Sequence, residues 1–175
     1  MKIGIIGSGK FGLVLARIAT ENKNEVLIYS RRANEVESIN STNESLSGFS
    51  FRELPISATQ DLSELDQCDA VLVTVASKDF KESINKFNYQ TYQGKFVSCV
   101  KGIEKHSGKL MTEVLVDEFH IDSNNVFVLS GPNLSKELGD QELTGTVIAG
   151  EDKIFINALC NALKTDYFLP FSSND

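Results

Sequence analysis

The stretch that decides the fold is KIGIIGSGKFG, residues 2–12, near the start of the 175-residue chain. Lys2–Ile6 is a short apolar run that ends at a glycine, which is typical of a buried strand. Gly7, Gly9 and Gly12 follow in the pattern G-x-G-x-x-G, and a mostly apolar helical segment continues from them. A strand, a glycine turn and a helix in this order predict a seat for the pyrophosphate of a dinucleotide.

Each glycine of the turn has its own reason to be there. Gly7 permits the tight turn, Gly9 lets the backbone approach the phosphates, and Gly12 lets the helix pack on the strand. The free N–H groups and the dipole at the start of the helix favour negative charge. Glycine turns are common, so the prediction depends on the position of this one, at the first strand–helix junction of the chain.

The end of the second expected strand, Glu25–Tyr29, bears on the type of dinucleotide. An NAD-specific site usually has a carboxylate about 20 residues beyond the glycines, bound to the ribose 2′-hydroxyl. This chain has Arg31 and Arg32 there. Guanidinium groups can bind a 2′-phosphate, which predicts a preference for NADP(H) while NAD(H) stays a second option. The alternative is that both arginines lie on a solvated turn.

Strand and helix patterns alternate along the rest of the chain, which predicts an α/β fold of the doubly wound, Rossmann type, with a mostly parallel sheet and helices on both faces. The run AVLVTV at Ala70–Val75 is the expected central strand. The further strands are expected at Lys95–Val100, Val126–Leu129, Thr144–Ala149 and Tyr167–Phe171. Helices are expected at Ala33–Ser41, around Phe80–Phe87, at Leu110–Phe119 and at Lys153–Leu163.

Two local features between residues 40 and 70 complete this prediction. Asn40–Phe51 is rich in Ser, Asn and Gly and is expected to be a loop. Asp61 and Glu64 have the spacing of a capping box that opens a short helix. We expect one domain over residues 1–175, because the length suits a single core and no linker interrupts the alternation.

Composition excludes several classes of protein. The formal charge of −7 argues against nucleic acid as a partner. The apolar runs are far shorter than a membrane span, so we expect a cytoplasmic protein without a membrane partner. Cys68, Cys99 and Cys160 are widely spaced and predict neither disulfides nor a metal site. His106 and His120 are expected at the surface, and no nucleophile motif appears.

Several later segments resemble bacterial NAD(P)-dependent glycerol-3-phosphate dehydrogenases, specifically their amino-terminal cofactor-binding domain. SCVKGIE at 98–104 with SGKLM at 107–111 is similar to the family's TKGIE…TGxLM. LSGPNLSKE at 129–137 is similar to its SGPxxAxE, and VLVTVAS at 71–77 to its ILVxVPS. FSSND at 171–175 is similar to the YxNxD that precedes the family's second domain. The matches keep their order across essentially the whole chain.

The resemblance implies roles at the matching positions. Cofactor contacts fall on the glycine turn, the two arginines, the lysine of the KGIE segment and the serine of the last motif. These residues are Gly7, Gly9, Lys10, Phe11, Gly12, Arg31, Arg32, Lys101 and Ser135. Substrate contacts fall on Lys101, Gly131 and Asn133. Without the resemblance, Lys101 is simply a lysine in a Lys-Gly turn.

The chain departs from the family at several of these points. It has Lys10-Phe11 where Ser or Asn is followed by Trp or Tyr, Ala76 in place of Pro, and Ser135 in place of Ala. Thr or Ser is commoner than Asn at 133. The family's YLP loop is not recognisable in Ser45–Pro55, so contacts of that segment with the cofactor stay open.

The activity implied by the resemblance is reduction of dihydroxyacetone phosphate to sn-glycerol 3-phosphate with NAD(P)H, for phospholipid synthesis. The family's catalytic lysine lies in an all-helical second domain, so no catalytic residue is expected in this chain, which alone should be inactive. A homodimer is one assembly that the resemblance allows for the full-length enzyme. The alternatives are a stand-alone NADP(H)-binding or redox-sensing module, and a related reductase of a small substrate.

Overall fold

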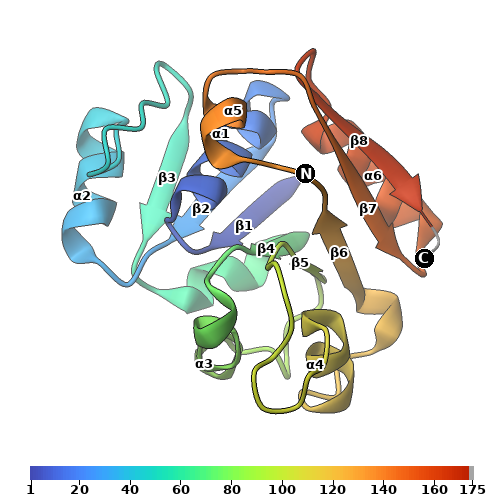
Figure 1. Ribbon diagram of the computed structural model, residues 1–175. Coiled ribbons are helices and arrows are strands. Elements are labelled where there is room, and N and C mark those ends of the chain that lie inside the picture. The colour runs from blue at the N-terminus through green and yellow to red at the C-terminus, as the bar shows by residue number, and fades with distance from the viewer. Residues whose placement is uncertain (174–175) are drawn as a thin grey trace.

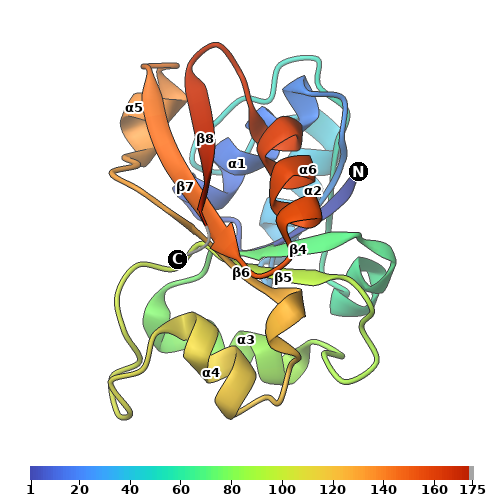
Figure 2. The same ribbon diagram turned by 90° about the vertical axis from the view of Figure 1, so that its right-hand side faces the viewer.

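The structure of the chain, a computed structural model, describes residues 1–173. The last two residues of the FSSND segment, Asn174 and Asp175, lie outside the described residues. One sheet runs through the molecule, with helices α3 and α4 below it and α1 and α6 above it (Figure 1, Figure 2). This arrangement confirms the predicted doubly wound α/β fold.

The sheet has eight strands in the order β3-β2-β1-β4-β5-β6-β7-β8. They are β1 (Lys2–Ile6), β2 (Glu25–Tyr29), β3 (Ile56–Thr59), β4 (Ala70–Val73), β5 (Lys95–Ser98), β6 (Val126–Ser130), β7 (Thr144–Gly150) and β8 (Phe168–Ser173). All neighbouring pairs are parallel except β6 and β7, which are antiparallel. From β1 the chain first builds the sheet in one direction, through β2 and β3, and then in the other direction, starting with β4. The crevice at this reversal point, between β1 and β4, is where such sheets bind ligands.

Within residues 1–173, six α-helices connect or cover the strands. They are α1 (Lys10–Glu21), α2 (Ala33–Thr42), α3 (Phe80–Lys86), α4 (Met111–Asp117), α5 (Ser135–Gly139) and α6 (Lys153–Leu163). The bounds of α2 and α6 match the sequence-based expectation to within a residue. The expected central strand was two residues too long, because β4 ends at Val73, and Thr74 and Val75 line the cleft described below.

Each face of the sheet has its own apolar core. One core joins alternate strand residues such as Ile5, Leu72 and Phe127 to buried residues of α1 and α6. The other joins Val71, Val73 and Phe96 to buried residues of α3 and α4. Alternate residues of β1 and β4 enter opposite cores, as expected for strands covered on both faces.

The segment between α2 and β4 differs from the sequence-based expectation. β3, a short strand, was not predicted, and it forms the edge of the sheet beside β2. The predicted capping box at Asp61 and Glu64 is wrong in one half. Asp61 accepts the N–H of Ser63 at 2.9 Å and opens a 3₁₀ helix over Leu62–Gln67, but Glu64 accepts the hydroxyl of Thr59 at 2.8 Å. Thr59 also accepts the N–H of Asp61, so the reciprocal bond has no donor left.

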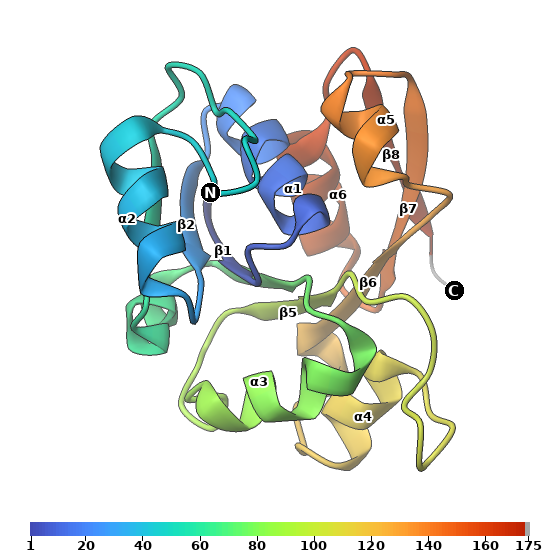
Figure 3. The same cartoon turned by 60° about the vertical axis from the view of Figure 1, so that its left-hand side comes forward.

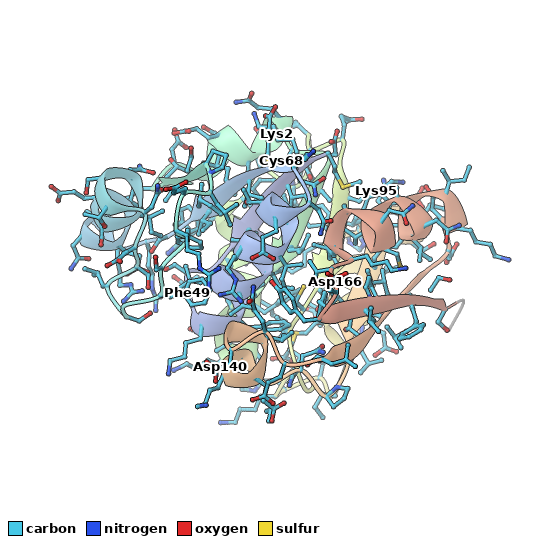
Figure 4. All side chains as sticks on the ribbon, turned by 90° about the horizontal axis from the view of Figure 1, so that it is seen from above. Lys2, Phe49, Cys68, Lys95, Asp140 and Asp166 are labelled. Atoms are coloured by element: carbon cyan, nitrogen blue, oxygen red, sulfur yellow. The ribbon has the colours of Figure 1, made fainter. Side chains whose placement is uncertain are left out.

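The cysteines lie in or beside the cores, and the expected surface position of the histidines is confirmed. Cys68 and Cys99 are buried, Cys160 is half-buried, and all three are free thiols. Burial raises the pKa of the Cys68 thiol to about 11, so it stays protonated at neutral pH. Figure 4 shows Cys68 on the side of the molecule where Lys2 and Lys95 begin β1 and β5. His106 and His120 are exposed.

Candidate nucleotide-binding site

The glycine turn lies at the carboxyl end of β1 and is fixed there by backbone and side-chain bonds. Gly7 has φ of +118°, a left-handed conformation that favours glycine. Its N–H donates to the carbonyl of Tyr29 on β2 at 3.2 Å. The hydroxyl of Thr74, the residue after β4, lies 3.1 Å from the carbonyl oxygens of both Ile6 and Gly7. The turn is thus held from both neighbouring strands.

Gly12 and Gly9 differ in what surrounds them. A Cβ on Gly12 would lie 2.2 Å from the carbonyl oxygen of Gly7 and 2.6 Å from the hydroxyl of Thr74, so the start of α1 packs directly on the turn. A Cβ on Gly9 would meet nothing within 4 Å. Gly9 is also the N-cap of α1 and receives no side-chain cap. The uncapped start of this helix therefore borders open space, which suits a phosphate group.

A cleft of about 390 Å³ opens beside the turn, between the ends of β1, β2 and β4. The turn, the end of β2, the segment after β4 and α3 supply its lining: Gly7, Ser8, Gly9, Tyr29, Ser30, Arg31, Arg32, Thr74, Val75, Ala76, Asp79 and Ser83. Four of the residues expected to contact a cofactor are among them, namely Gly7, Gly9, Arg31 and Arg32. The cleft provides room, backbone donors and cations for a nucleotide.

The structure places the other expected cofactor residues outside the lining of this cleft. Lys10 is exposed at the first position of α1, and Phe11 is half-buried against the core. Gly12 lies beneath the turn. Ser135 is half-buried at the start of α5.

The residues expected to bind substrate form one cluster. The Nζ atom of Lys101, after β5, donates to the backbone carbonyl of Asn133, after β6, at 2.9 Å. A Cβ on Gly131 would lie 3.1 Å from Oδ1 of Asn133. The Asn133 side chain is buried and already bonded, since its Nδ2 donates to the Gly145 carbonyl at 2.9 Å and its Oδ1 accepts the Thr146 hydroxyl at 3.0 Å. Among these side chains, Lys101 is the one exposed to solvent.

The loop that carries Lys101 is held by a buried carboxylate. Glu104 accepts the N–H and the hydroxyl of Ser107, at 2.7 and 2.8 Å, and the N–H of His106 at 3.0 Å. The Nζ atom of Lys81, on α3, lies 3.5 Å from Oε2 of Glu104. These bonds, those of Ser107 first, lower the pKa of Glu104 to about 2. The loop around Lys101 is therefore built on a carboxylate that is ionised at neutral pH.

Sequence reasoning missed several residues of the site. Ser8, Ser30 and Thr74 line the cleft without having been assigned a role, and Glu35 forms an ion pair with Arg32, with Nη2 and Oε2 3.3 Å apart. Glu35 lies six positions beyond the end of β2, three residues after Arg32 on the next helical turn. That spacing was a signal, because residues three apart on a helix are neighbours.

Residues 1–173 contain neither a membrane-spanning helix nor a metal-binding cluster. No helix among them is long and apolar enough to cross a membrane. No group of three or more His, Cys, Asp or Glu side chains there is arranged to hold a metal ion.

A glycine turn against an open helix N-terminus, at the reversal point of a parallel sheet, defines a nucleotide-binding α/β domain of the Rossmann type. The comparisons specify the family. Residues 2–156 match the family described as NAD-dependent glycerol-3-phosphate dehydrogenase N-terminus, and the chain belongs to it. The predicted resemblance is confirmed.

Relatives match nearly the whole chain. A glycerol-3-phosphate dehydrogenase [NAD(P)+] of Alcanivorax borkumensis is 34% identical, over 98% of this chain and 50% of the relative. One of Corynebacterium aurimucosum is 31% identical, over 99% and 53%. The chain thus spans about half the length of the curated relatives it matches. The solved glycerol-3-phosphate dehydrogenase of Coxiella burnetii has the same fold, with a TM-score of 0.84 at 24% identity over 99% of this chain and 54% of that one.

Proposed function

We propose that this chain is the cofactor-binding half of an NAD(P)H-dependent glycerol-3-phosphate dehydrogenase, which reduces dihydroxyacetone phosphate to sn-glycerol 3-phosphate for phospholipid synthesis. The observation that carries the proposal is the cleft at the strand reversal point, lined by the glycine turn and two arginines, in a chain of this family. Dihydroxyacetone phosphate would be the partner, and the full-length enzyme would work in the cytoplasm.

The residues of the cleft divide the cofactor between them. The turn from Gly7 to Gly12 and the start of α1 would hold the pyrophosphate, and Arg31 and Arg32 would face the adenosine end. When bound, the nicotinamide supplies the hydride. The open space at Gly9 supports the binding of such a group at this turn.

Lys101 is the residue of this chain best placed to act on substrate. An ammonium group has three N–H donors, and one of them is used on the Asn133 carbonyl. That bond aims the side chain along the loop after β6 and leaves donors for a phosphate or carbonyl oxygen. The Asn133 side chain is already hydrogen-bonded to β7. Asn133 and Gly131 would therefore contact substrate through their backbone atoms and through the shape of the surface that they form.

The test has a binding arm and an activity arm. In calorimetry at fixed salt, the chain should bind NADPH more tightly than NADH, by about 10- to 100-fold, the worth of charge-assisted bonds to a 2′-phosphate. The product of the complete gene should oxidise NADPH when dihydroxyacetone phosphate is added. Binding without turnover in the complete product would favour a stand-alone NADP(H)-binding module, and absence of binding would refute the site.

A further inference from the structure

A buried carboxylate lies directly behind the adenosine end of the cleft. The side chain of Glu35, in the first turn of α2, is 1% exposed. Its Oε2 atom lies 3.3 Å from Nη2 of Arg32 and accepts the N–H of Leu46 at 3.2 Å. Its Oε1 atom is buried without a hydrogen-bond partner among the described residues. A buried charge satisfied on one side only depends strongly on its ion-pair partner.

Arg32 is anchored on the cleft side as well. Its Nη2 atom donates to the hydroxyl of Ser8 in the glycine turn at 3.3 Å, and that hydroxyl donates to Ser30 at 2.8 Å. The backbone N–H of Arg32 donates to Ser30 at 3.3 Å. The guanidinium is therefore fixed between the turn and Glu35, and its charge is opposed at contact distance.

Arg31 has a different environment. Both arginines are exposed, but unlike Arg32, Arg31 has no carboxylate of residues 1–173 within 4.0 Å. The nearby carboxylate of Glu82, on α3, is already taken by Lys86 at 2.6 Å. The side-chain amide of Gln60 donates to the backbone carbonyl of Arg31 at 3.3 Å, so this bond does not engage the guanidinium. Of the two arginines that line the cleft, Arg31 is thus the one with an uncompensated charge.

We propose that Arg31 is the residue that distinguishes NADPH from NADH, and that Glu35 limits this discrimination by neutralising Arg32. This inference rests on the proposed function, since it concerns the same cleft. With Glu35 in place, a 2′-phosphate meets one uncompensated cation instead of two. The preference for NADPH is then modest, near the lower end of the range given above, and NADH remains usable.

These contacts predict that Glu35→Gln strengthens the binding of a 2′-phosphorylated ligand. Glutamine has nearly the same shape, and Ser8 still holds Arg32, so the guanidinium keeps its place while the buried negative charge is lost. The site gains one positive charge close to the 2′-phosphate. At the effective dielectric of a partly solvated cleft, and with salt screening, this should tighten binding of a 2′-phosphorylated ligand about 5- to 10-fold.

The test uses two fragments that differ only in the 2′-phosphate, adenosine 2′,5′-bisphosphate and adenosine 5′-monophosphate, titrated calorimetrically at fixed salt. The ratio of their dissociation constants should rise about 5- to 10-fold in Glu35→Gln. In the double variant Glu35→Gln/Arg32→Gln the ratio should return to the wild-type value, because the pair is again neutral. A merely structural role of Glu35 would weaken both fragments alike and leave the ratio unchanged, which would overturn the proposal.

A second variant decides the matter if Glu35→Gln does not fold. Arg31 is exposed, so Arg31→Gln should fold, and its ratio should fall to about 1, a loss of roughly 10-fold. If Arg31→Gln keeps the wild-type ratio, Arg32 is the discriminating cation and the proposal is wrong. If neither fragment nor NADPH binds to the wild-type chain, it is the proposed function that fails.

Discussion

At the scale of single residues, two glycines of one turn limit substitution in opposite ways. Gly12 has no room for a Cβ, because the Gly7 carbonyl oxygen would lie 2.2 Å away and backbone atoms cannot yield. Gly9 has free space on the side where a Cβ would point. The first position therefore concerns folding, and the second concerns what enters the cleft.

The pair gives a matched test of the pyrophosphate seat. Gly9→Val should fold and melt close to the wild type, since its side chain enters open space, but it should lose binding of both NADPH and NADH. Gly12→Ala is the control, in which the close approach should lower the melting temperature markedly. Calorimetry and thermal unfolding of both variants are the measurements. Normal nucleotide binding by folded Gly9→Val would place the phosphates elsewhere.

Glu104 sets a pH dependence for the loop of Lys101. Its pKa is lowered to about 2 by hydrogen bonds from Ser107 and His106 and by the charge of Lys81. A carboxyl group whose pKa is lower in the folded chain stabilises the fold above its unfolded pKa, near 4.5, and loses that effect as pH falls towards 2.

We therefore expect Glu104→Gln to melt at a lower temperature than the wild type at pH 7. The gap between the two should hold down to about pH 5 and narrow from there towards pH 2, because the Glu104 carboxyl is protonated in the unfolded chain over this range while it stays ionised in the folded one. Parallel thermal melts of both proteins across this range measure it. A gap that is independent of pH would show that the lost bonds matter and the charge does not.

At the scale of elements, Arg17 connects α1 to two segments that are distant from it in sequence, α5 and the loop around Phe49. The buried guanidinium of Arg17 donates to the carbonyls of Leu138 and Gly139, at 2.9 and 3.1 Å, at the carboxyl end of α5. The same group lies 5.1 Å from the ring centroid of Phe49. Figure 3 shows the segment between α2 and β3 running back towards α1, and Figure 4 shows Phe49 beside that helix.

Arg17→Met should loosen α5 and the segment around Phe49 together. Methionine fills much of the volume but removes the donor to both carbonyls. The Leu138 carbonyl still accepts the N–H of Gln141 at 3.1 Å, whereas the Gly139 carbonyl is left without a donor among the described residues. This should lower the free energy of unfolding by about 1–3 kcal/mol. Urea unfolding measures the loss, and amide hydrogen exchange should rise in residues 135–139 first. Unchanged exchange there would mean that α5 is held by its apolar contacts alone.

Periodicity could predict most elements, because buried strands such as β4 and amphipathic helices such as α6 carry their pattern locally. It could not predict β3, whose four residues, Ile56–Thr59, are half polar. That strand depends on its neighbours: β2 pairs with one edge, and on the other the Asn40 side chain bonds both the N–H and the carbonyl of Ala58, at 2.8 and 2.9 Å. An edge closed by a side chain 18 positions away has no local signature.

The same limit applies to the candidate site. The glycine turn and the arginines were predictable, because each lies in a short motif at a strand end. Their partners from other strands were not. Ser8 bonds Ser30 at the end of the neighbouring strand, and Thr74, just after β4, fixes the turn. These contacts arise only when the sheet forms. Glu35 differs, because its spacing of three residues from Arg32 was a local signal, and it supplies a carboxylate near the end of β2 in space although none stands there in sequence.

At the scale of the whole molecule, the antiparallel pairing of β6 and β7 breaks the strand–helix–strand rhythm. The connection between them contains only α5, a helix of five residues, which is too short for the crossover that parallel strands need. The chain therefore turns back after Asn133, and the buried amide of that residue bonds β7 directly. The reversal brings Gly131 and Asn133 beside Lys101, so these three residues form one wall of the proposed substrate site.

That single wall leads to the last prediction. The chain of residues 1–175 should bind NADPH yet show no measurable reduction of dihydroxyacetone phosphate. Lys101 is exposed, and the neighbouring Asn133 side chain is committed to β7, so no second group of the described residues holds the Lys101 ammonium in place against a substrate carbonyl. General acid catalysis is worth about 10²–10⁴-fold by itself. Orientation and exclusion of water, which need an opposite wall, add to that deficit.

Both the chain and the complete gene product should be assayed by NADPH absorbance at saturating substrate. In the complete product, Lys101→Ala should lower turnover and weaken substrate binding. Turnover by the short chain at a rate near that of the complete product would show that the acid lies within residues 1–175, and Lys101 would be the first group to test for that role.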